Sequence, residues 1–298
     1  MIEHLDLNEF IKNPHLFSNL EFKVISKILL NAKKTFENDN ILLEFNLKNR
    51  DKEIYVIGDI HGNFESLVKI IEIIKENNPE LVIFLGDIVD RGPKQLECLL
   101  IVLTLKILNP QTYHLLRGNH ETIEMNQYYG FFQNFIDKYK DPKKFNEILA
   151  VYDVLPICAL INNTILCLHG GIPQDTEILK KLKGYKTKNL IKIFNSISNA
   201  IFQIMWNDPK SELKGFSNSF RGSGIYLFGE DAFNNFMRTN DLEYLIRAHE
   251  CFPEGYRWFF NKKLLSIFSS ANYRGFYSPN PASYAVIRKN KIIPKIIR

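Results

Sequence analysis

The stretch "FLGDIVDRGP" at residues 84–93 places charged side chains directly after an apolar run. Residues 81–85 are apolar and short, which is typical of a strand buried in a sheet. A glycine ends the run, and Asp87, Asp90 and Arg91 follow. Two carboxylates and a guanidinium at the point where the chain leaves its core indicate a site that faces a crevice.

The same arrangement occurs on both sides of this stretch. An apolar run at 54–57 precedes "GDIHGN", and another at 112–116 precedes "RGNHE". Helical periodicity at 64–76, and a further helix that opens near Pro93, separate the three runs. This β-α-β-α-β order predicts parallel strands joined by right-handed crossovers. The carboxyl ends of such strands share one edge of the sheet, where ligands bind in open α/β folds.

The remaining chain predicts a second sheet. Helices are expected at 21–36 and beyond residue 125, and a hairpin turned at Asn162-Asn163 is expected to end before His169. The C-terminal part reads as short strands at 244–248, 256–260, 264–268 and from 284 onward. We expect an α/β fold with a central β-sandwich flanked by helices, in one domain over 1–298. Residues 1–50 would form an N-terminal helical segment, and residues 51–298 the catalytic core.

Composition narrows the class of protein. The chain has 298 residues, of which 45% are hydrophobic, and a formal net charge of +5 without a clustered basic stripe, so we expect no nucleic-acid partner. The N-terminus lacks the features of a signal peptide, and the apolar stretch 96–108 is shorter than the roughly 20 residues that span a bilayer. The four cysteines form no CxxC pair and lie in or beside apolar runs. We expect free thiols, no membrane partner and a cytoplasmic location.

Polar side chains that could bind metals follow several of the predicted strands. They are Asp59, His61, Asp87, Asn119, His120, His169 and His249. Oxygen and imidazole ligands without cysteine suit a pair of first-row divalent metals, and a central aspartate such as Asp87 is the natural bridging ligand. His114 lies inside a predicted strand and is expected to be a packed core residue, whereas His4 and His15 are expected at the surface.

The joint pattern resembles the phosphoprotein phosphatase family, the metal-dependent serine/threonine phosphatases that include types 1 and 2A and calcineurin. Three stretches resemble the signature motifs of that family: Gly58-Asp59-Ile60-His61-Gly62, Gly86-Asp87-Ile88-Val89-Asp90-Arg91-Gly92 and Arg117-Gly118-Asn119-His120-Glu121. Later landmarks follow in family order at 129–132, 169–171, 206–209, 221–222, 247–250 and 270–273. The resemblance runs from about residue 25 to about residue 290 and implies a metallophosphatase fold.

The resemblance also implies a division of roles among the site residues. One metal ion would be held by Asp59, His61 and Asp87, and the other by Asp87, Asn119, His169 and His249. The substrate phosphate would be bound by Arg91, Arg117 and Arg221, with Asn119 and Tyr273 beside them. His120 would be the general acid that protonates the leaving oxygen, and Asp90 would orient it. The implied cofactors are two divalent metal ions, manganese first, with iron and zinc as alternatives.

Elementary chemistry supports these roles. A phosphomonoester is a dianion, which calls for cations and for the fork-shaped donors of arginine. Its hydrolysis is extremely slow without catalysis, and a metal-bound water yields a nucleophile near neutral pH. The serine alkoxide is a poor leaving group, so a general acid is needed. The expected activity is therefore hydrolysis of phosphoserine and phosphothreonine in proteins by a water that the dinuclear metal centre activates.

Two positions depart from the family pattern, and two other functions stay open. Residues 269–274 read Ser-Ser-Ala-Asn-Tyr-Arg, without the proline and cysteine that are usual there, and Glu250 replaces a glutamine. We expect a less rigid loop and altered toxin sensitivity.

A related diadenosine-polyphosphate hydrolase is an alternative, although Glu121 and the stretch 206–273 argue against it. A non-catalytic scaffold would have lost ligands, but the expected positions are filled. The sequence names no regulatory subunit.

Overall fold

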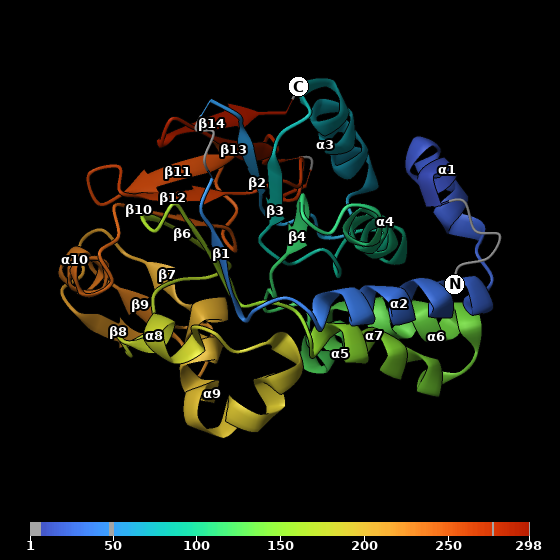
Figure 1. Ribbon diagram of the computed structural model, residues 1–298, viewed down its shortest axis with the longest axis horizontal. Helices are drawn as coiled ribbons and strands as arrows, with labels where there is room; N and C mark the ends of the chain where they lie inside the picture. Colours follow the sequence, from blue (N-terminus) through green and yellow to red (C-terminus); the bar gives the residue numbers. More distant parts are fainter. Residues whose placement is uncertain (1–6, 48–50, 276, 298) are drawn as a thin grey trace.

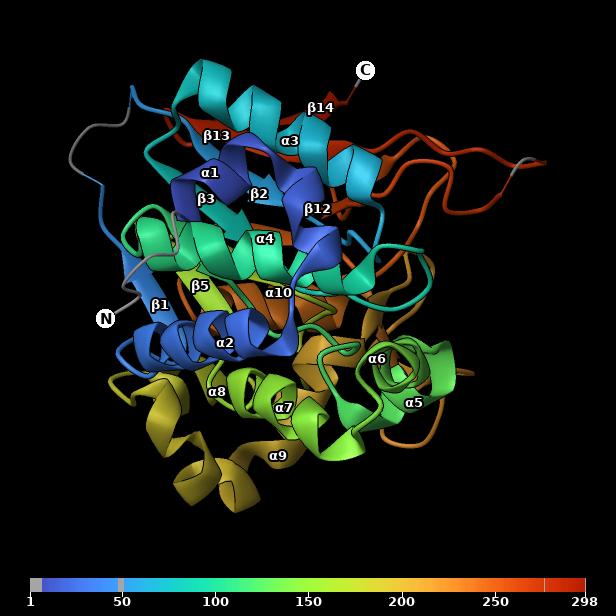
Figure 2. The ribbon, with the colours of Figure 1, turned by 90° about the vertical axis from the view of Figure 1, so that its right-hand side faces the viewer.

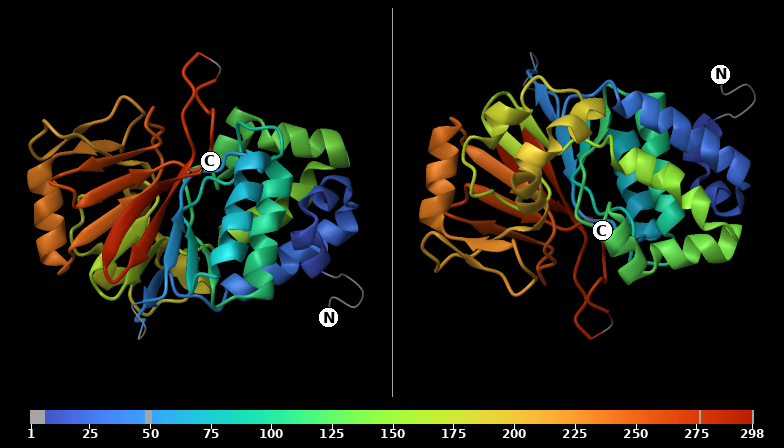
Figure 3. Two further views of the ribbon diagram at one scale, coloured as in Figure 1. Left: turned by 90° about the horizontal axis from the view of Figure 1, so that it is seen from above. Right: turned by 90° about the horizontal axis from the view of Figure 1, so that it is seen from below.

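The computed structural model describes residues 7–47, 51–275 and 277–297, with the side chains of 191–195 left aside. Two sheets stack face to face, and helices cover the outer face of each (Figure 1). The predicted α/β class with a central β-sandwich flanked by helices is confirmed. The views along the other axis show the same layers edge-on, with the two sheets between two groups of helices (Figure 3).

The first sheet contains the three predicted parallel strands. Its order is β14-β13-β2-β3-β4, formed by β14 (Lys291–Ile296), β13 (Ser283–Arg288), β2 (Ile54–Ile57), β3 (Leu81–Phe84) and β4 (Tyr113–Leu115). Strand β2 pairs with β3 and β3 with β4 in parallel, whereas β13 is antiparallel to β2. The β-α-β-α-β scaffold therefore forms as expected, with α3 (Phe64–Asn77) and α4 (Gln95–Leu108) as its crossovers.

The second sheet brings together distant parts of the chain. Its order is β1-β5-β6-β10-β12-β11, formed by β1 (Leu42–Phe45), β5 (Cys158–Ile161), β6 (Ile165–Leu168), β10 (Tyr244–Arg247), β12 (Leu264–Ile267) and β11 (Tyr256–Phe259). The hairpin β5–β6 turns at Asn162 and Asn163, both in the left-handed region. A small third sheet contains β7 (Asp208–Pro209), β9 (Tyr226–Phe228) and β8 (Phe216–Asn218).

The remaining helices form the two outer layers. Beside the first sheet lie α1 (Leu7–Lys12), α2 (Phe22–Phe36), α5 (Ile123–Tyr129), α6 (Phe131–Tyr139) and α7 (Asn146–Tyr152), with the 3-10 turns Pro14–Asn19 and Pro142–Phe145. Figure 2 shows α2 running beside α4 and α7. The outer face of the second sheet is covered by α8 (Ile178–Leu182), α9 (Leu190–Trp206) and α10 (Glu230–Thr239). A 3-10 turn at Thr187–Asn189 directly precedes α9.

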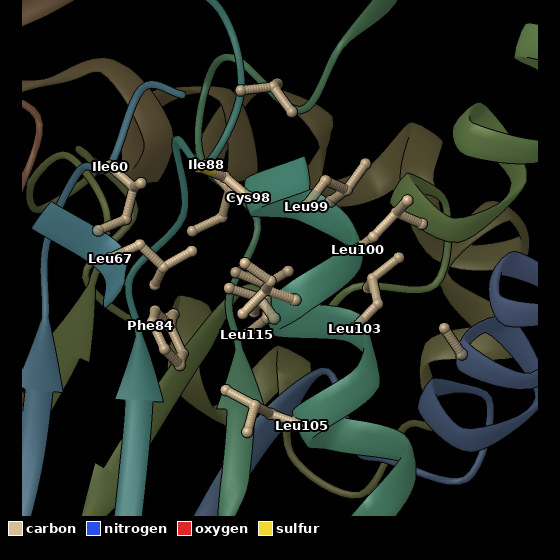
Figure 4. Close-up of a cluster of buried hydrophobic side chains, with 14 of the residues drawn as sticks. Ile60, Leu67, Phe84, Ile88, Cys98, Leu99, Leu100, Leu103, Leu105 and Leu115 are labelled. Atoms are coloured by element: carbon tan, nitrogen blue, oxygen red, sulfur yellow. The ribbon is translucent and has the colours of Figure 1, made fainter. Parts of the chain in front are cut away.

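Alternation along the central strands explains why they are apolar throughout. Ile54 and Val56 of β2 face the second sheet, whereas Tyr55 and Ile57 face the helices. Successive side chains of a strand point to opposite faces, so a strand covered on both faces reads as a continuous apolar run. The apolar helix α4 packs on this sheet. Its Leu105 lies on the side of the strands, whereas Leu100 and Leu103 point away from them (Figure 4).

The N-terminal segment differs from the prediction for residues 1–50. Of its described residues, those of α1 and α2 are helical, but β1 is a strand that pairs in parallel with β5 in the second sheet. The apolar run at 41–45 is short, and it becomes a strand because the hairpin offers it a free edge. Residues 1–6 and 48–50 of this segment, and with them His4, lie outside the described residues.

The histidine expected in the core packs as predicted. His114 is 5% exposed in β4, and its ring lies 4.7 Å from that of Phe45. The ammonium of Lys106 lies 3.1 Å from its Nδ1 atom and 2.9 Å from Oδ2 of Asp39. Burial, followed by the charge of Lys106, lowers the pKa of His114 to about 3. His15 is exposed, as predicted.

Two further expectations concern thiols and membranes. The cysteines are free, with three of them buried and Cys251 partly exposed. Burial raises the pKa of Cys158 to about 12, so this thiol stays protonated. Over the described ranges, the longest apolar helix falls short of what a membrane crossing needs.

Candidate active site

A cavity of about 240 Å³ opens where strands from both sheets end. The segment after β2 brings His61 to it, the segment after β3 brings Asp87, and the segment after β4 brings Asn119 and His120. His249, which follows β10 in the second sheet, completes this side of the wall. The polar side chains expected at strand ends are thus neighbours in space.

Asp87 lies at the centre of the imidazole groups. Its Oδ2 atom is 3.3 Å from Nε2 of His169, 3.7 Å from Nε2 of His61 and 4.0 Å from Nε2 of His120. The residue is 1% exposed. Burial raises the pKa of Asp87, but the nearby imidazoles, His169 first, outweigh burial and hold that pKa well below its usual range. Asp87 is therefore a fixed anion among three rings.

Nitrogen and oxygen atoms converge around His169. Its Nδ1 atom donates to the Leu85 carbonyl at 3.0 Å, which leaves Nε2 without a proton in the neutral ring. That Nε2 atom lies 2.8 Å from Oδ1 of Asn119 and 3.2 Å from Nδ1 of His249. Burial, with the charge of Arg221 next, holds the pKa of His249 well below its usual range. The neutral ring of His249 keeps a lone pair available.

Asp59 and His61 form the other side of the cluster. Nε2 of His61 lies 3.6 Å from Oδ2 of Asp59, and its Nδ1 atom donates to the Val89 carbonyl at 2.9 Å. Burial opposes a charge on His61, but Asp59 and Asp87 outweigh it and raise the pKa of the ring to about 9. The Asp59 carboxylate also accepts the backbone N–H of His249 at 3.0 Å, which ties the two sheets together.

His120 and Asp90 form a buried pair beside this cluster. Nδ1 of His120 lies 2.8 Å from Oδ2 of Asp90, and Asp90 is fully buried. With Nδ1 held by the carboxylate, Nε2 of His120 faces the cavity. The backbone N–H of His120 donates to Oδ1 of Asp87 at 2.9 Å, so the acid pair and the central carboxylate are fixed to one another.

The loops around the site adopt an uncommon backbone conformation. Positive φ angles occur at His61 (49°), Asp87 (54°), Asp90 (66°), Arg91 (74°) and His249 (69°). Residues other than glycine rarely adopt this region, and such conformations cluster at functional sites. Only glycine fits at position 86, where φ is 106°, because a Cβ atom there would lie 2.3 Å from the backbone nitrogen of Gly118.

Cations and aromatic rings complete the lining of the cavity. Arg91, Arg221 and Tyr273 are all part of this lining. The guanidinium of Arg91 lies 3.6 Å from the ring centroid of Tyr129, a cation–π contact, and Tyr273 stacks on His61 at 5.1 Å. The Nε atom of Arg221 donates to Oδ2 of Asp208 at 2.6 Å. Both guanidinium groups keep other donors for an anion in the cavity.

Arg117 differs in position from the other two predicted phosphate ligands. It lines an adjoining, mostly apolar chamber of about 700 Å³ between α5, α7 and α9. Its Nε atom donates to the Glu121 carbonyl at 3.2 Å, and burial lowers the pKa of its guanidinium. Arg117 therefore lines the chamber and not the catalytic cavity, and the two spaces share Trp206 and Arg221.

Comparison with known proteins agrees with this geometry. Residues 52–253 match the family model of the calcineurin-like phosphoesterases. The chain is 32% identical over 235 residues to a catalytic subunit of protein phosphatase 2A from Dictyostelium discoideum, covering 78% of this chain and 73% of that relative. This chain is a calcineurin-like phosphoesterase of the phosphoprotein phosphatase family.

Solved structures of two phosphatases share the fold. A protein serine/threonine phosphatase from Saccharomyces cerevisiae, with similarity to human phosphatase PP5, superimposes with a TM-score of 0.80 at 28% identity and covers 94% of this chain and 90% of its own. A cold-active protein-tyrosine phosphatase of Shewanella sp. reaches a TM-score of 0.61 at 15% identity, covering 88% of this chain and 84% of its own. The second likeness supports the fold alone.

The donor atoms of this phosphoesterase fit divalent metal ions. Oδ2 of Asp59 is buried without a hydrogen-bond partner among the described residues. Most buried polar atoms in folded proteins are paired, so an unpaired carboxylate oxygen in this cluster fits a bound cation. Two groups have ligand atoms close enough for one ion each: His61, Asp87 and His120, and Asp87, His169 and His249. Asp87 belongs to both groups.

Glu121 has a structural role in the site that the sequence did not lead us to expect. Its carboxylate accepts backbone N–H groups from Asp87 at 2.8 Å, Ile88 at 3.0 Å and Gly118 at 2.9 Å. Burial and the charge of Asp87 raise the pKa of Glu121 to about 7, whereas the N–H groups of Asp87 and Ile88 act in the opposite direction. Glu121 thus fixes two of the ligand-bearing loops to each other. The signal was a carboxylate that directly follows a predicted site loop.

The structure shows the contacts made at the two places where the sequence departs from the family pattern. Ala271 lies in a loop fixed by side chains, since its N–H donates to Oγ of Ser66 at 3.1 Å and its carbonyl accepts from Asn63 at 2.8 Å. These bonds hold the loop that was expected to lose rigidity. Glu250 lines the cavity and accepts from Arg247 at 2.7 Å. Burial raises its pKa to about 7 against the attraction of Arg247.

Proposed function

We propose that this protein hydrolyses phosphoserine and phosphothreonine residues of phosphoproteins. The single observation that carries the proposal is the pair His120–Asp90, with 2.8 Å between the ring nitrogen and the carboxylate. His120 lines one cavity together with Asp87 and the guanidinium groups of Arg91 and Arg221. One cavity thus combines a proton donor, anion-binding groups and metal-ligating atoms. The first two relatives described above are protein phosphatases by name, and the yeast one is named a serine/threonine phosphatase.

Two divalent metal ions are the proposed cofactors. One would be held by Asp59, His61 and Asp87, and the other by Asp87, Asn119, His169 and His249. When bound, such ions lower the pKa of water and neutralise charge on a phosphoryl group. Manganese is the ion we propose first, because oxygen and nitrogen ligands without thiolate suit it, and iron and zinc are the alternatives.

The residues of the chain supply binding and proton transfer. Arg91 and Arg221 bind the equatorial oxygens of the phosphate, because planar guanidinium groups match tetrahedral oxyanions. Arg117, Asn119 and Tyr273 complete the surroundings of that group. His120 gives its Nε2 proton to the serine or threonine oxygen as the bond to phosphorus breaks. Asp90 holds the opposite nitrogen, so that Nε2 points to the leaving group.

We further infer the setting of this activity. One core cluster joins buried residues from Leu7 to Ile297, which supports a single catalytic domain over the described residues. The free cysteines support a reducing compartment, and we place the protein in the cytoplasm. Phosphoproteins are the proposed partners, and we expect neither a nucleic-acid nor a membrane partner.

A direct assay separates this function from its alternative, hydrolysis of diadenosine polyphosphates. Metal-replete protein is given a phosphoserine peptide, a diadenosine polyphosphate and an aryl phosphate at equal concentrations. We expect turnover of the peptide and the aryl phosphate, and little of the dinucleotide. A kcat/KM that is highest for the dinucleotide contradicts the proposed function.

A further inference from the structure

A single buried amide holds both members of the acid pair. The Nδ2 atom of Asn126 donates to Oδ2 of Asp90 at 2.9 Å and to the backbone carbonyl of His120 at 2.8 Å. The side chain is 0% exposed. The same Asp90 oxygen accepts from Nδ1 of His120, and the other oxygen accepts the N–H of Phe131 at 3.2 Å. Asn126 is thus the one side chain besides His120 that donates to Asp90 among the hydrogen bonds of the described residues.

We propose that Asn126 is a positioning residue for His120: it fixes the Asp90 carboxylate so that the imidazole presents Nε2 to the leaving oxygen. This inference rests on the proposed function. Asn126 does not line the cavity, so it acts through Asp90 and not on the substrate. Both of its acceptors offer only lone pairs, which requires the NH₂ end of the amide to face them.

The choice of an amide at this position is informative. A carboxylate of the same shape would repel Asp90, and an apolar side chain would donate nothing. Oδ1 of Asn126 is buried without a hydrogen-bond partner among the described residues. A buried acceptor without a partner destabilises the fold, and an apolar group of similar shape avoids that cost. The residue at this site therefore serves more than packing.

The helix that carries Asn126 is itself fixed to the site. Thr122 caps helix α5, and its Oγ1 atom donates to the Asn119 carbonyl at 3.0 Å. One turn after Asn126, the ring of Tyr129 lies 4.8 Å from that of His120. Asn126 and Tyr129 thus contact the acid pair from the same helix, the amide on the Asp90 side and the ring on the imidazole side. The direction of His120 depends on this helix.

The test compares two leaving groups in wild type and Asn126→Leu. A serine alkoxide needs protonation as it departs, whereas an aryl oxide such as p-nitrophenolate leaves without help. We expect kcat for a phosphoserine peptide to fall roughly 10- to 100-fold, a part of the full general-acid effect, and kcat for p-nitrophenyl phosphate to fall less than about 3-fold. KM, manganese content and Tm are measured alongside. Equal losses on both substrates, or loss of metal, overturn the positioning role.

A double-mutant cycle separates action through Asp90 from an independent effect. In the Asp90→Asn background, Asn126→Leu should lower kcat for the phosphoserine peptide by less than about 3-fold, because residues that act as a unit are non-additive. Asn126→Ala, a smaller change, guards against a misfit of leucine and should give the same pattern. Fully additive losses overturn the inference. A wild-type protein inactive on both substrates removes the proposed function, and this inference with it.

Discussion

The Nε2 atom of His169 lies 3.2 Å from the Nδ1 atom of His249, and both face the Asp87 carboxylate. The Nδ1 proton of His169 is already committed to the Leu85 carbonyl. With the proton of His249 on Nε2, both rings direct a lone pair into the space between them. A divalent metal ion there would bind both lone pairs together with Asp87, and the family points to such an ion.

Metal removal should abolish activity. Protein stripped with a chelator, and checked for metal content, is expected to lose turnover of a phosphoserine peptide and to regain it with manganese. Oxygen and imidazole ligands release such ions more readily than a thiolate cage. As a control, His15→Gln changes an exposed imidazole and should leave metal content unaltered. Full turnover by protein verified to be metal-free would contradict the two-metal site.

His120→Asn should separate proton transfer from metal binding. His120 lies in one of the two groups of candidate ligands, yet its Nδ1 atom is held by Asp90. A lost general acid lowers kcat for phosphoserine by roughly two to four orders of magnitude, and less for an aryl phosphate. Metal content, measured by mass spectrometry, should stay near that of wild type. A variant that loses an ion instead identifies His120 as a ligand.

Glu121→Gln should destabilise the loops that carry Asp87 and Gly118. A glutamine oxygen cannot accept all three backbone N–H groups that the carboxylate accepts. An unsatisfied buried donor and the lost charge-assisted bonds lower the free energy of unfolding by about 2–4 kcal/mol. Urea denaturation measures this loss. The exposed Glu124→Gln is the matched control and should change stability by less than about 0.5 kcal/mol. Equal stability of the two variants would refute the bridging role.

The parallel strands and their loops were predictable because one physical constraint governs them. Strands buried on both faces need uninterrupted apolar runs, so β2 and β3 were located to within one residue. The crossover rule then placed Asp59, Asp87 and Asn119 at one edge. These site residues follow from local pattern and general topology.

Other features depend on contacts that a local pattern does not encode. Strand β1 is defined by its pairing with β5, which is far away in the sequence. Arg117 faces the apolar chamber because α7 and α9 form the other walls of that chamber. The role of Asn126 similarly depends on where Asp90 lies after folding. In each case the deciding neighbour lies too far along the chain for periodicity to identify.

His114 should make the protein less stable in mild acid. Its pKa is lowered from 6.5 to about 3 in the folded protein, so between these values the unfolded chain binds more protons. Stability therefore falls as pH drops below 6.5, by about 2 kcal/mol at pH 5 from this residue. His114→Gln should remove that part of the loss, since a glutamine oxygen can still accept from Lys106. Denaturation at pH 7 and pH 5 measures it, and an unchanged difference would exclude His114.

Arg274 should favour substrates with acidic residues beside the phosphate. The side chain is exposed directly after Tyr273, which lines the cavity. Arg274 lies close to Cys251: burial raises the pKa of that thiol to about 12, and the charge of Arg274 acts in the opposite direction. Arg274→Cys should therefore raise KM for an acidic phosphopeptide more than for a neutral one, with kcat nearly unchanged, as for lost uniform binding.

Salt should weaken the preference of the wild type, because exposed charges are screened beyond about 10 Å at 0.1 M. Arg238→Cys, on α10 at the outer face, is the control. A ratio of the two KM values that is the same in wild type and Arg274→Cys would leave the arginine without a part in substrate choice.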